Sequence, residues 1–157
     1  MKLRRNRPSV AVAPGESILA SAMTADGRSV CGTRDALYLP SRIPWESVEA
    51  ADWDSETSTL RVAEIDAEPH SVVLEADEPR RLLELIRERV TASVVLQRHV
   101  PVDGKRGLRV IARRAPGRRD NLTWMTRYDD GIDPDDPDVQ RLAAETLALA
   151  KSDVGLS

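Results

Sequence analysis

The sequence predicts an α+β fold in which antiparallel strands form a barrel or sandwich and an amphipathic helix closes it. Short stretches with alternating apolar residues recur up to residue 74, and turn signals separate them. The apolar spacing then changes to that of a helix. Strands at this spacing are typical of sandwiches and partly open barrels. At 157 residues, the chain fits one domain or one domain with an appendage.

The strands are expected in the first half of the chain, after a flexible basic arm at residues 1–15. Four cations and two prolines in that arm discourage regular structure. Asp26 and Gly27 are typical of a hairpin turn. Pro40 and Pro44 interrupt the ladder, because proline lacks the amide hydrogen that a ladder needs. Six strands are predicted, at residues 17–23, 28–32, 34–39, 47–54, 59–65 and 70–74.

A helix is predicted over residues 77–90. Asp77 is a suitable N-cap, Pro79 lies in the first turn, and apolar residues recur at helical spacing from Leu82 to Val90. One helix packed on a set of antiparallel strands is a self-consistent unit, so residues 16–90 are expected to form a β-domain.

Residues 91–157 are predicted to add a β-hairpin or three-strand extension and a C-terminal helix. Strands are expected at 93–102, 108–115 and 122–128. Asp136 can cap the last helix with Pro137 at its first position, and Gly155 can end it. The sequence leaves open whether this segment completes the barrel or forms a separate lobe.

The strand at residues 32–39 reads Gly-Thr-Arg-Asp-Ala-Leu-Tyr-Leu, and an Ile43-Pro44-Trp45 segment leads into the next strand. An amphipathic helix then follows. Together these features resemble a bacterial pleckstrin-homology-like (PH-like) domain over residues 16–90. The resemblance implies a barrel of about seven antiparallel strands closed by one helix. The bias toward Ala, Arg, Asp and Val also resembles uncharacterised actinobacterial proteins.

The composition favours a cytoplasmic protein. The longest apolar runs, such as residues 94–96, are far too short to span a bilayer. The first residues lack the pattern of a secretory signal. Cys31 is the single cysteine, so the chain cannot form an intrachain disulfide, and this favours a reducing compartment.

The net charge of −3 conceals blocks of opposite sign. Residues 16–78 carry 14 acidic and 4 basic residues, whereas residues 120–138 carry 7 acidic and 1 basic. Between them, residues 98–119 carry 8 basic residues and 1 acidic. These eight cations are the strongest candidate interaction site: Arg98, Lys105, Arg106, Arg109, Arg113, Arg114, Arg118 and Arg119.

The basic block predicts a non-enzymatic interaction or regulatory module. It would dock through the hairpin onto an acidic partner protein, or onto a second copy of the chain. The alternative is binding of anionic lipid or phosphate groups by the same arginines, including weak attraction to an anionic membrane surface. A third interpretation assigns no binding role to these arginines: the chain's own acidic residues neutralise their charge. Nucleic acid is disfavoured, because no aromatic residues alternate with the arginines.

Trp53 and Tyr38 are a second candidate interaction site. Trp53 shares one face of its strand with Ala51 and Glu49, and the sequence does not decide whether that face points inward. An exposed Trp53 beside Tyr38 would anchor a partner protein, whereas burial in the core is the structural alternative.

No catalytic constellation, metal site or cofactor motif is visible in the sequence. His70 and His99 lack ligand partners at zinc spacing, and Cys31 lacks a basic setting that would activate it. The acidic run at residues 129–138 departs from the pattern of an EF-hand loop. It is interpreted as a solvated linker that caps the last helix.

Overall fold

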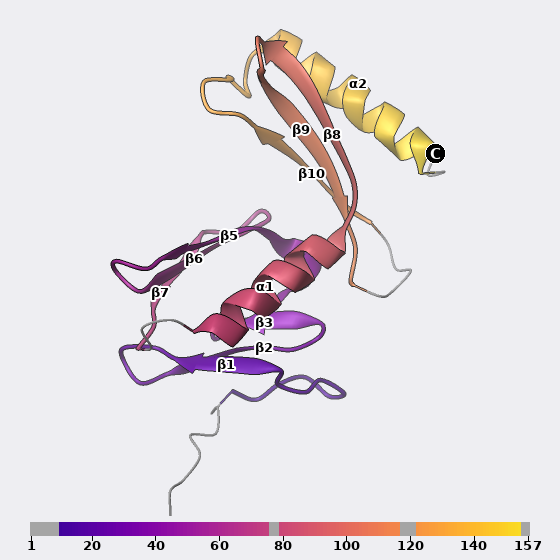
Figure 1. The fold of residues 1–157 in the computed structure, drawn as a ribbon. Helices are drawn as coiled ribbons and strands as arrows, with labels where there is room; N and C mark the ends of the chain where they lie inside the picture. Colours follow the sequence, from indigo (N-terminus) through magenta and orange to yellow (C-terminus); the bar gives the residue numbers. More distant parts are fainter. Residues whose placement is uncertain (1–9, 76–78, 117–121, 155–157) are drawn as a thin grey trace, which may run out of the picture. The chain divides into compact units, whose positions relative to one another are not determined.

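The computed structural model describes residues 10–75, 79–116 and 122–154, and it divides the chain into two compact units. The first contains seven strands and a helix, and the second contains three strands and a helix. The described residues form three antiparallel sheets, so the chain is α+β as predicted (Figure 1). The first unit ends at Ser93 and the second begins at Val94, and Ala115 and Pro116 are again assigned to the first unit.

The first sheet contains four strands in chain order: β1 (Ala20–Met23), β2 (Ser29–Gly32), β3 (Ala36–Tyr38) and β4 (Arg42–Pro44). Gly27 has a φ of +87° in the β1–β2 turn, which confirms the predicted hairpin. Strand β4 was not predicted, because Pro44 is unfavourable for a ladder. Pro44 ends an outer strand opposite Ala36, where the missing N–H removes no ladder bond.

The second sheet follows a short 3-10 turn, η1 (Trp45–Ser47), and contains β5 (Val48–Asp54), β6 (Thr59–Glu64) and β7 (His70–Val73). It meets the first sheet through a bridge between Thr24 and Leu74, and Ala25 N donates to Val73 O at 2.8 Å. In the described residues β4 and β5 do not pair, so the two sheets do not close into the expected barrel.

Helix α1 (Arg80–Ser93) crosses one side of both sheets, and it contacts β1, β2 and β5 (Figure 1). It starts later than predicted, and the predicted cap Asp77 lies outside the described residues. Leu82, Ile86 and the fully buried Trp45 belong to the main core. Gly32 permits the close approach of α1, because a Cβ at that position would lie 2.6 Å from Leu85 Cδ2.

The second unit is a three-stranded sheet with one helix on one face. Strands β8 (Val94–Asp103), β9 (Arg106–Arg113) and β10 (Thr123–Tyr128) lie in the order β10-β9-β8, and α2 (Pro137–Asp153) packs on them. The predicted cap is confirmed, since the Asp136 side chain accepts from Asp138 N at 2.8 Å. Gly155 lies outside the described residues. Neither described helix is long and apolar enough to cross a membrane.

Candidate functional site

A groove of about 660 Å³ lies between strand β5 and helix α1 of the first unit, and it is named here the β5–α1 groove. Ala51, Asp52 and Trp53 of β5 line one wall. Consecutive residues of a strand point to opposite faces. A groove that touches all three therefore reaches the edge of β5.

The floor of the β5–α1 groove is apolar. Trp53 pairs with Leu60 of β6, and both line the groove on the side of α1. Leu83, Ile86 and Val90 complete the floor from the helix. The Trp53 ring is partly buried and packs against the main core. It is therefore part of the floor and not an isolated exposed anchor.

Among the described strands, none pairs with the edge of β5 that borders the groove. β5 is the outer strand of its sheet, and β6 pairs with its other edge. An outer strand presents a row of unpaired backbone N–H and C=O groups. In the part of the chain that the structure describes, residues 50–53 make backbone hydrogen bonds to no element except β6.

Charged side chains form the rim of the β5–α1 groove. Arg80 and Arg87 lie seven residues apart on α1, which places them on one helix face with Glu84 between them. Asp52 lies on the opposite wall. None of these four side chains makes an ion pair or hydrogen bond within residues 10–75, 79–116 and 122–154. They are therefore available to a bound partner.

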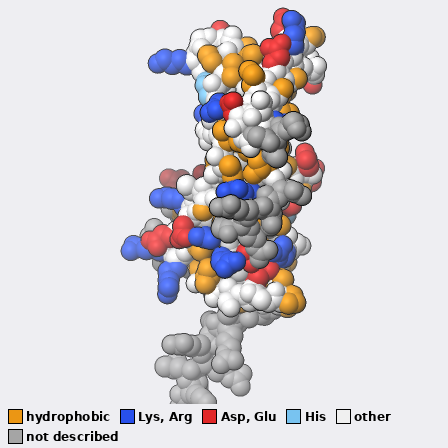
Figure 2. Space-filling view, turned by 90° about the vertical axis from the view of Figure 1, so that its right-hand side faces the viewer, with side chains coloured by type: hydrophobic (Ala, Val, Ile, Leu, Met, Phe, Trp, Pro, Cys, Tyr) orange, Lys and Arg blue, Asp and Glu red, His pale blue; other side chains and the backbone are white. Residues whose placement is uncertain are grey.

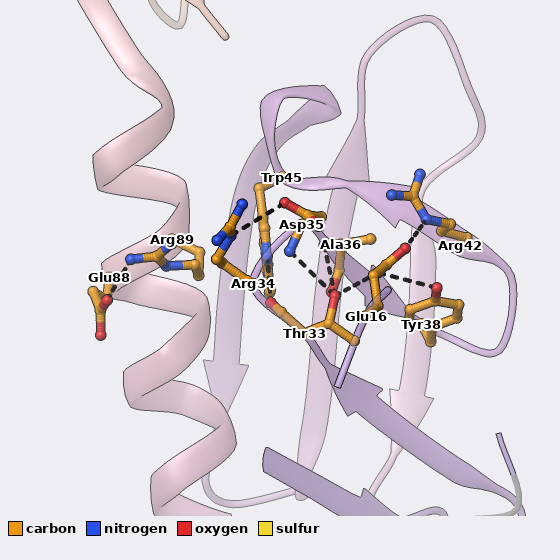
Figure 3. A network of polar contacts seen from close by, with 10 residues as sticks. All are labelled: Glu16, Thr33, Arg34, Asp35, Ala36, Tyr38, Arg42, Trp45, Glu88 and Arg89. Carbon is orange, nitrogen blue, oxygen red and sulfur yellow. Dashed lines mark hydrogen bonds and ion pairs between the residues drawn. The ribbon is translucent and has the colours of Figure 1, made fainter. Parts of the chain in front are cut away.

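Tyr38 lies in a buried polar network of the first sheet (Figure 3). Its hydroxyl donates to Glu16 Oε1 at 3.2 Å, and Glu16 also accepts from Thr33 Oγ1 at 2.6 Å and from Arg42 Nε at 3.0 Å. Tyr38 is only 4% exposed and belongs to β3, whereas Trp53 belongs to β5 in another sheet. Of the two alternatives for Tyr38, burial in the core is therefore the one that the structure supports, and Tyr38 is not an exposed neighbour of Trp53.

The same network ties the N-terminal segment to the first sheet. Residues 10–15 were predicted as part of a flexible arm, yet Val10 and Val12 pack against Cys31. Burial, together with the nearby Glu16 carboxylate, raises the pKa of the Cys31 thiol to about 11. A raised pKa is the opposite of the activation that a nucleophilic thiol needs.

The predicted basic site is dispersed over the second unit. Alternation along the strands places Arg98 on the face toward α2, where it pairs with Asp153 at 2.9 Å. Arg109 lies on the other face, and Arg113 is only 5% exposed. Burial therefore removes Arg113 from the predicted docking surface, whereas Arg98 is exposed and pairs with Asp153. Figure 2 shows basic and acidic side chains interspersed on the face it draws.

Three further predicted cations lie near the ends of the β8–β9 hairpin. Lys105 and Arg106 are exposed at its turn, and Arg114 is partly buried just after β9. Arg118 and Arg119 lie outside the described residues.

Both histidines pair with carboxylates that sequence spacing did not suggest. His70 Nε2 lies 2.8 Å from Glu64 Oε1, and His99 Nε2 lies 3.1 Å from Asp129 Oδ2. The first pair joins neighbouring strands, and the second joins residues 30 positions apart. Among the described residues, no group of three or more His, Cys, Asp or Glu side chains could hold a metal ion.

Comparison with known proteins gives no match. No family model matches the chain, and neither a curated protein nor a solved structure matches it. The function is therefore inferred from the residues and geometry of the chain itself.

Proposed function

We propose that the protein is a non-enzymatic interaction module that binds an extended segment of another protein in the β5–α1 groove. One observation carries the proposal: an unpaired strand edge borders a groove of about 660 Å³ that has an apolar floor and a charged rim. A bound segment would add a strand beside β5, with main-chain hydrogen bonds for affinity. Its alternate side chains would contact Trp53, Leu83 and Ile86, which would provide specificity.

A PH-like fold for the first unit is part of this proposal. The resemblance implies about seven strands followed by one helix, and β1 to β7 followed by α1 support it. The contact between the two sheets at Thr24 and Leu74, with α1 across both sheets, also supports it.

Charge on β5 favours a partner segment over the β5 strand of a second copy. Three of its seven residues are acidic: Glu49, Asp52 and Asp54. Two antiparallel β5 strands would bring like charges together, which destabilises cross-strand pairs. We therefore expect a partner segment with apolar residues at alternate positions and Lys or Arg between them.

Docking through the basic hairpin, onto a partner protein or a second copy, stays a prediction. The exposed Lys105 and Arg106 are the described cations that support it best. Light scattering at low and high ionic strength tests self-association, because salt screens attraction between exposed charges. A mass that stays monomeric at both salt concentrations removes self-docking.

Peptide selection tests the β5–α1 groove directly. A displayed library of random peptides is selected on the full chain, and the affinity of enriched peptides is measured for two variants. Ala51→Lys fills the groove from an exposed position without removing a core contact. Ala67→Lys makes the same change in the exposed β6–β7 turn and is the control.

We expect Ala51→Lys to weaken binding about tenfold or more, because the Lys side chain occupies the groove and excludes apolar side chains of the peptide. Ala67→Lys should bind as the wild type does. Backbone amides of β5 and α1 should shift when peptide is added. If no peptide is enriched, or if both variants bind equally, the proposal is overturned.

A further inference from the structure

Strand β10 of the second unit has a free edge that lacks the features which usually prevent pairing. It is an outer strand of its sheet, and β9 pairs with its other edge in a continuous register. Among the described residues, 123–128 make backbone hydrogen bonds to no element except β9. Proteins usually protect such edges with proline, bulges or charged side chains. β10 contains neither proline nor a bulge, and Arg127 is its single charged residue.

The opposite edge of the same sheet is protected. Strand β8 contains Pro101, and two bulges interrupt its pairing with β9, between Val94 and Leu96 and between Pro101 and Asp103. In the second unit, β10 is therefore the described outer strand that is better suited to accept another strand.

The hydrogen-bond pattern shows which backbone groups of β10 point away from β9. Asp129 N donates to Gly107 O of β9 at 2.9 Å, so the backbone groups of both residues lie between these two strands. Successive residues of an antiparallel strand direct their backbone groups to opposite edges. In the continuous register, Trp124, Thr126 and Tyr128 therefore direct their N–H and C=O groups to the free edge.

We propose that two copies of the chain form a dimer by antiparallel pairing of their β10 strands, with Thr126 opposite Thr126 of the second copy. The two Thr126 residues then form a hydrogen-bonded pair, and on each side Trp124 of one copy pairs with Tyr128 of the other. All outward backbone groups of β10 find partners in this register. The two sheets become one continuous antiparallel sheet around a two-fold axis.

The side chains of β10 are complementary to those of a second copy in this register. Trp124 and Tyr128 lie partly buried on the face that α2 covers, and aromatic pairs across neighbouring strands are stabilising. Thr126 meets its own copy, and paired threonines are also favourable. On the other face, Arg127 lies opposite Met125 of the second copy, so the register brings no like charges together.

Charge on α2 also favours a second copy as the partner. The last turn of α2 reaches the start of β10, where Lys151 Nζ lies 6.0 Å from the centroid of the Trp124 ring, so α2 runs back along the strand (Figure 1). The two-fold axis therefore directs Lys151 toward the start of α2 in the second copy. Asp135, Asp136 and Asp138 are exposed there. Opposite charges at these two helix ends are complementary.

The β10 dimer is separate from the β5–α1 groove and does not depend on peptide binding there. It stops at two copies, because the other edge of the sheet is protected. It also differs from docking through the basic hairpin, since salt screens exposed charges but not backbone hydrogen bonds or aromatic contacts. We therefore expect a dimer that persists at high ionic strength.

Hydrogen exchange of the full-length protein tests the proposed register. At a concentration that populates the dimer, the amides of Trp124, Thr126 and Tyr128 should be protected, and dilution should remove this protection. The internal control is the outer edge of β8. Gln97 and His99 pair with β9 residues whose backbone groups point toward β10, so their own amides point outward. These two amides should exchange rapidly at both concentrations.

A proline substitution removes the central hydrogen bonds of the dimer. Proline is tolerated on an outer strand where the N–H faces outward, so Thr126→Pro removes no ladder bond within the chain. We expect it to raise the dissociation constant of the dimer about tenfold or more, measured by light scattering on dilution at high salt. Gln97→Pro makes the same change at an exposed position on the other edge of the sheet and should leave the dimer unchanged.

A monomeric chain would overturn the proposal. That result is a wild-type mass that stays monomeric at about 1 mM, a concentration at which even weak complexes form. Equal weakening by both proline variants would also overturn it, as would rapid exchange of the three outward β10 amides in a dimeric sample. The exchange measurement needs no variant, so it decides the matter if Thr126→Pro does not fold. None of these results bears on peptide selection by the β5–α1 groove.

Discussion

Glu16 is an ionised carboxylate whose side chain is only 4% exposed in the first unit. Burial alone would raise its pKa, but hydrogen bonds from Thr33, Arg42 and Tyr38 and the charge of Arg42 outweigh burial, so the pKa of Glu16 is lowered. Thr33 supports this arrangement, since its hydroxyl also accepts from Ala36 N at 3.1 Å. The network therefore stabilises the first sheet only while Glu16 carries its charge.

Glu16→Gln tests this stabilisation. A lowered pKa in the folded state stabilises the protein above the unfolded value of about 4.3, and this stabilisation is lost as pH falls through the folded value. At pH 7, Glu16→Gln should therefore lower the free energy of unfolding by about 1–3 kcal/mol, the range for hydrogen bonds to a charged group. The difference from wild type should shrink in acid, because protonated Glu16 then resembles Gln. Urea unfolding at several pH values measures it.

Glu56→Gln is the matched control, because Glu56 is exposed in the β5–β6 turn. It should change the free energy of unfolding little at any pH. A Glu16→Gln effect of equal size at neutral and acidic pH would contradict a role for the charge.

Sequence reasoning could not find the Glu16 network, for a physical reason. Glu16 is 17 residues from Thr33 and 26 from Arg42, and the contact exists only after β2, β3 and β4 have paired. Burial of Trp45 likewise depends on the folded sheet. Its indole N–H donates to Thr33 O at 2.8 Å, a partner that only the folded sheet provides.

At the scale of elements, alternation of apolar residues and turn residues predicted most strands. One strand, β4, was missed because it contains a proline. Pro44 was taken as a reason against pairing, yet β4 pairs with β3 as the outer strand of its sheet. Whether a strand lies at an edge depends on the order of all four strands, which local sequence does not contain. The β5–α1 groove was not predicted for the same reason, because it depends on how β5 and α1 pack. From the spacing of apolar residues alone, Leu83 and Val90 were expected on a buried helix face.

The cap of α2 was predictable from local sequence, and it can be tested. The Asp136 side chain accepts from Asp138 N, so Asp136→Ala leaves that N–H without its acceptor. We expect it to lower the free energy of unfolding of the second unit by about 1 kcal/mol. Asp130→Ala removes a similar exposed charge before the helix without removing the cap, and it should have a smaller effect. Equal effects in chemical denaturation would mean that charge alone is responsible.

At the scale of the whole molecule, blocks of charge along the sequence do not map onto blocks in space. The basic block lies mainly on β8 and β9, where alternation distributes its residues over two faces. Arg98 reaches Asp153 of α2 from a distance of 55 residues. Counting charges along the sequence therefore predicts the strands that carry the cations, but it does not predict a single surface formed by them.

The hydrophobic cores divide along the same boundary as the two units, which leads to a prediction about stability. Leu82 lies in the core of the first unit and Leu108 in that of the second, and both are about 1% exposed or less. Replacing either by Ala should cost about 2–5 kcal/mol through lost burial and a cavity. Leu149→Ala changes an exposed side chain on α2 and should cost little.

Hydrogen exchange of backbone amides locates each loss, because protection reports the free energy of local opening. Leu108→Ala should reduce protection in β8, β9 and β10 more than in β5 and β6, and Leu82→Ala should do the reverse. Leu149→Ala should leave both patterns close to those of the wild type. A core that unfolded as one cooperative whole would instead lose protection equally in all strands with either buried substitution. That result would show that the two units do not behave as separate folding units, whatever their cores suggest.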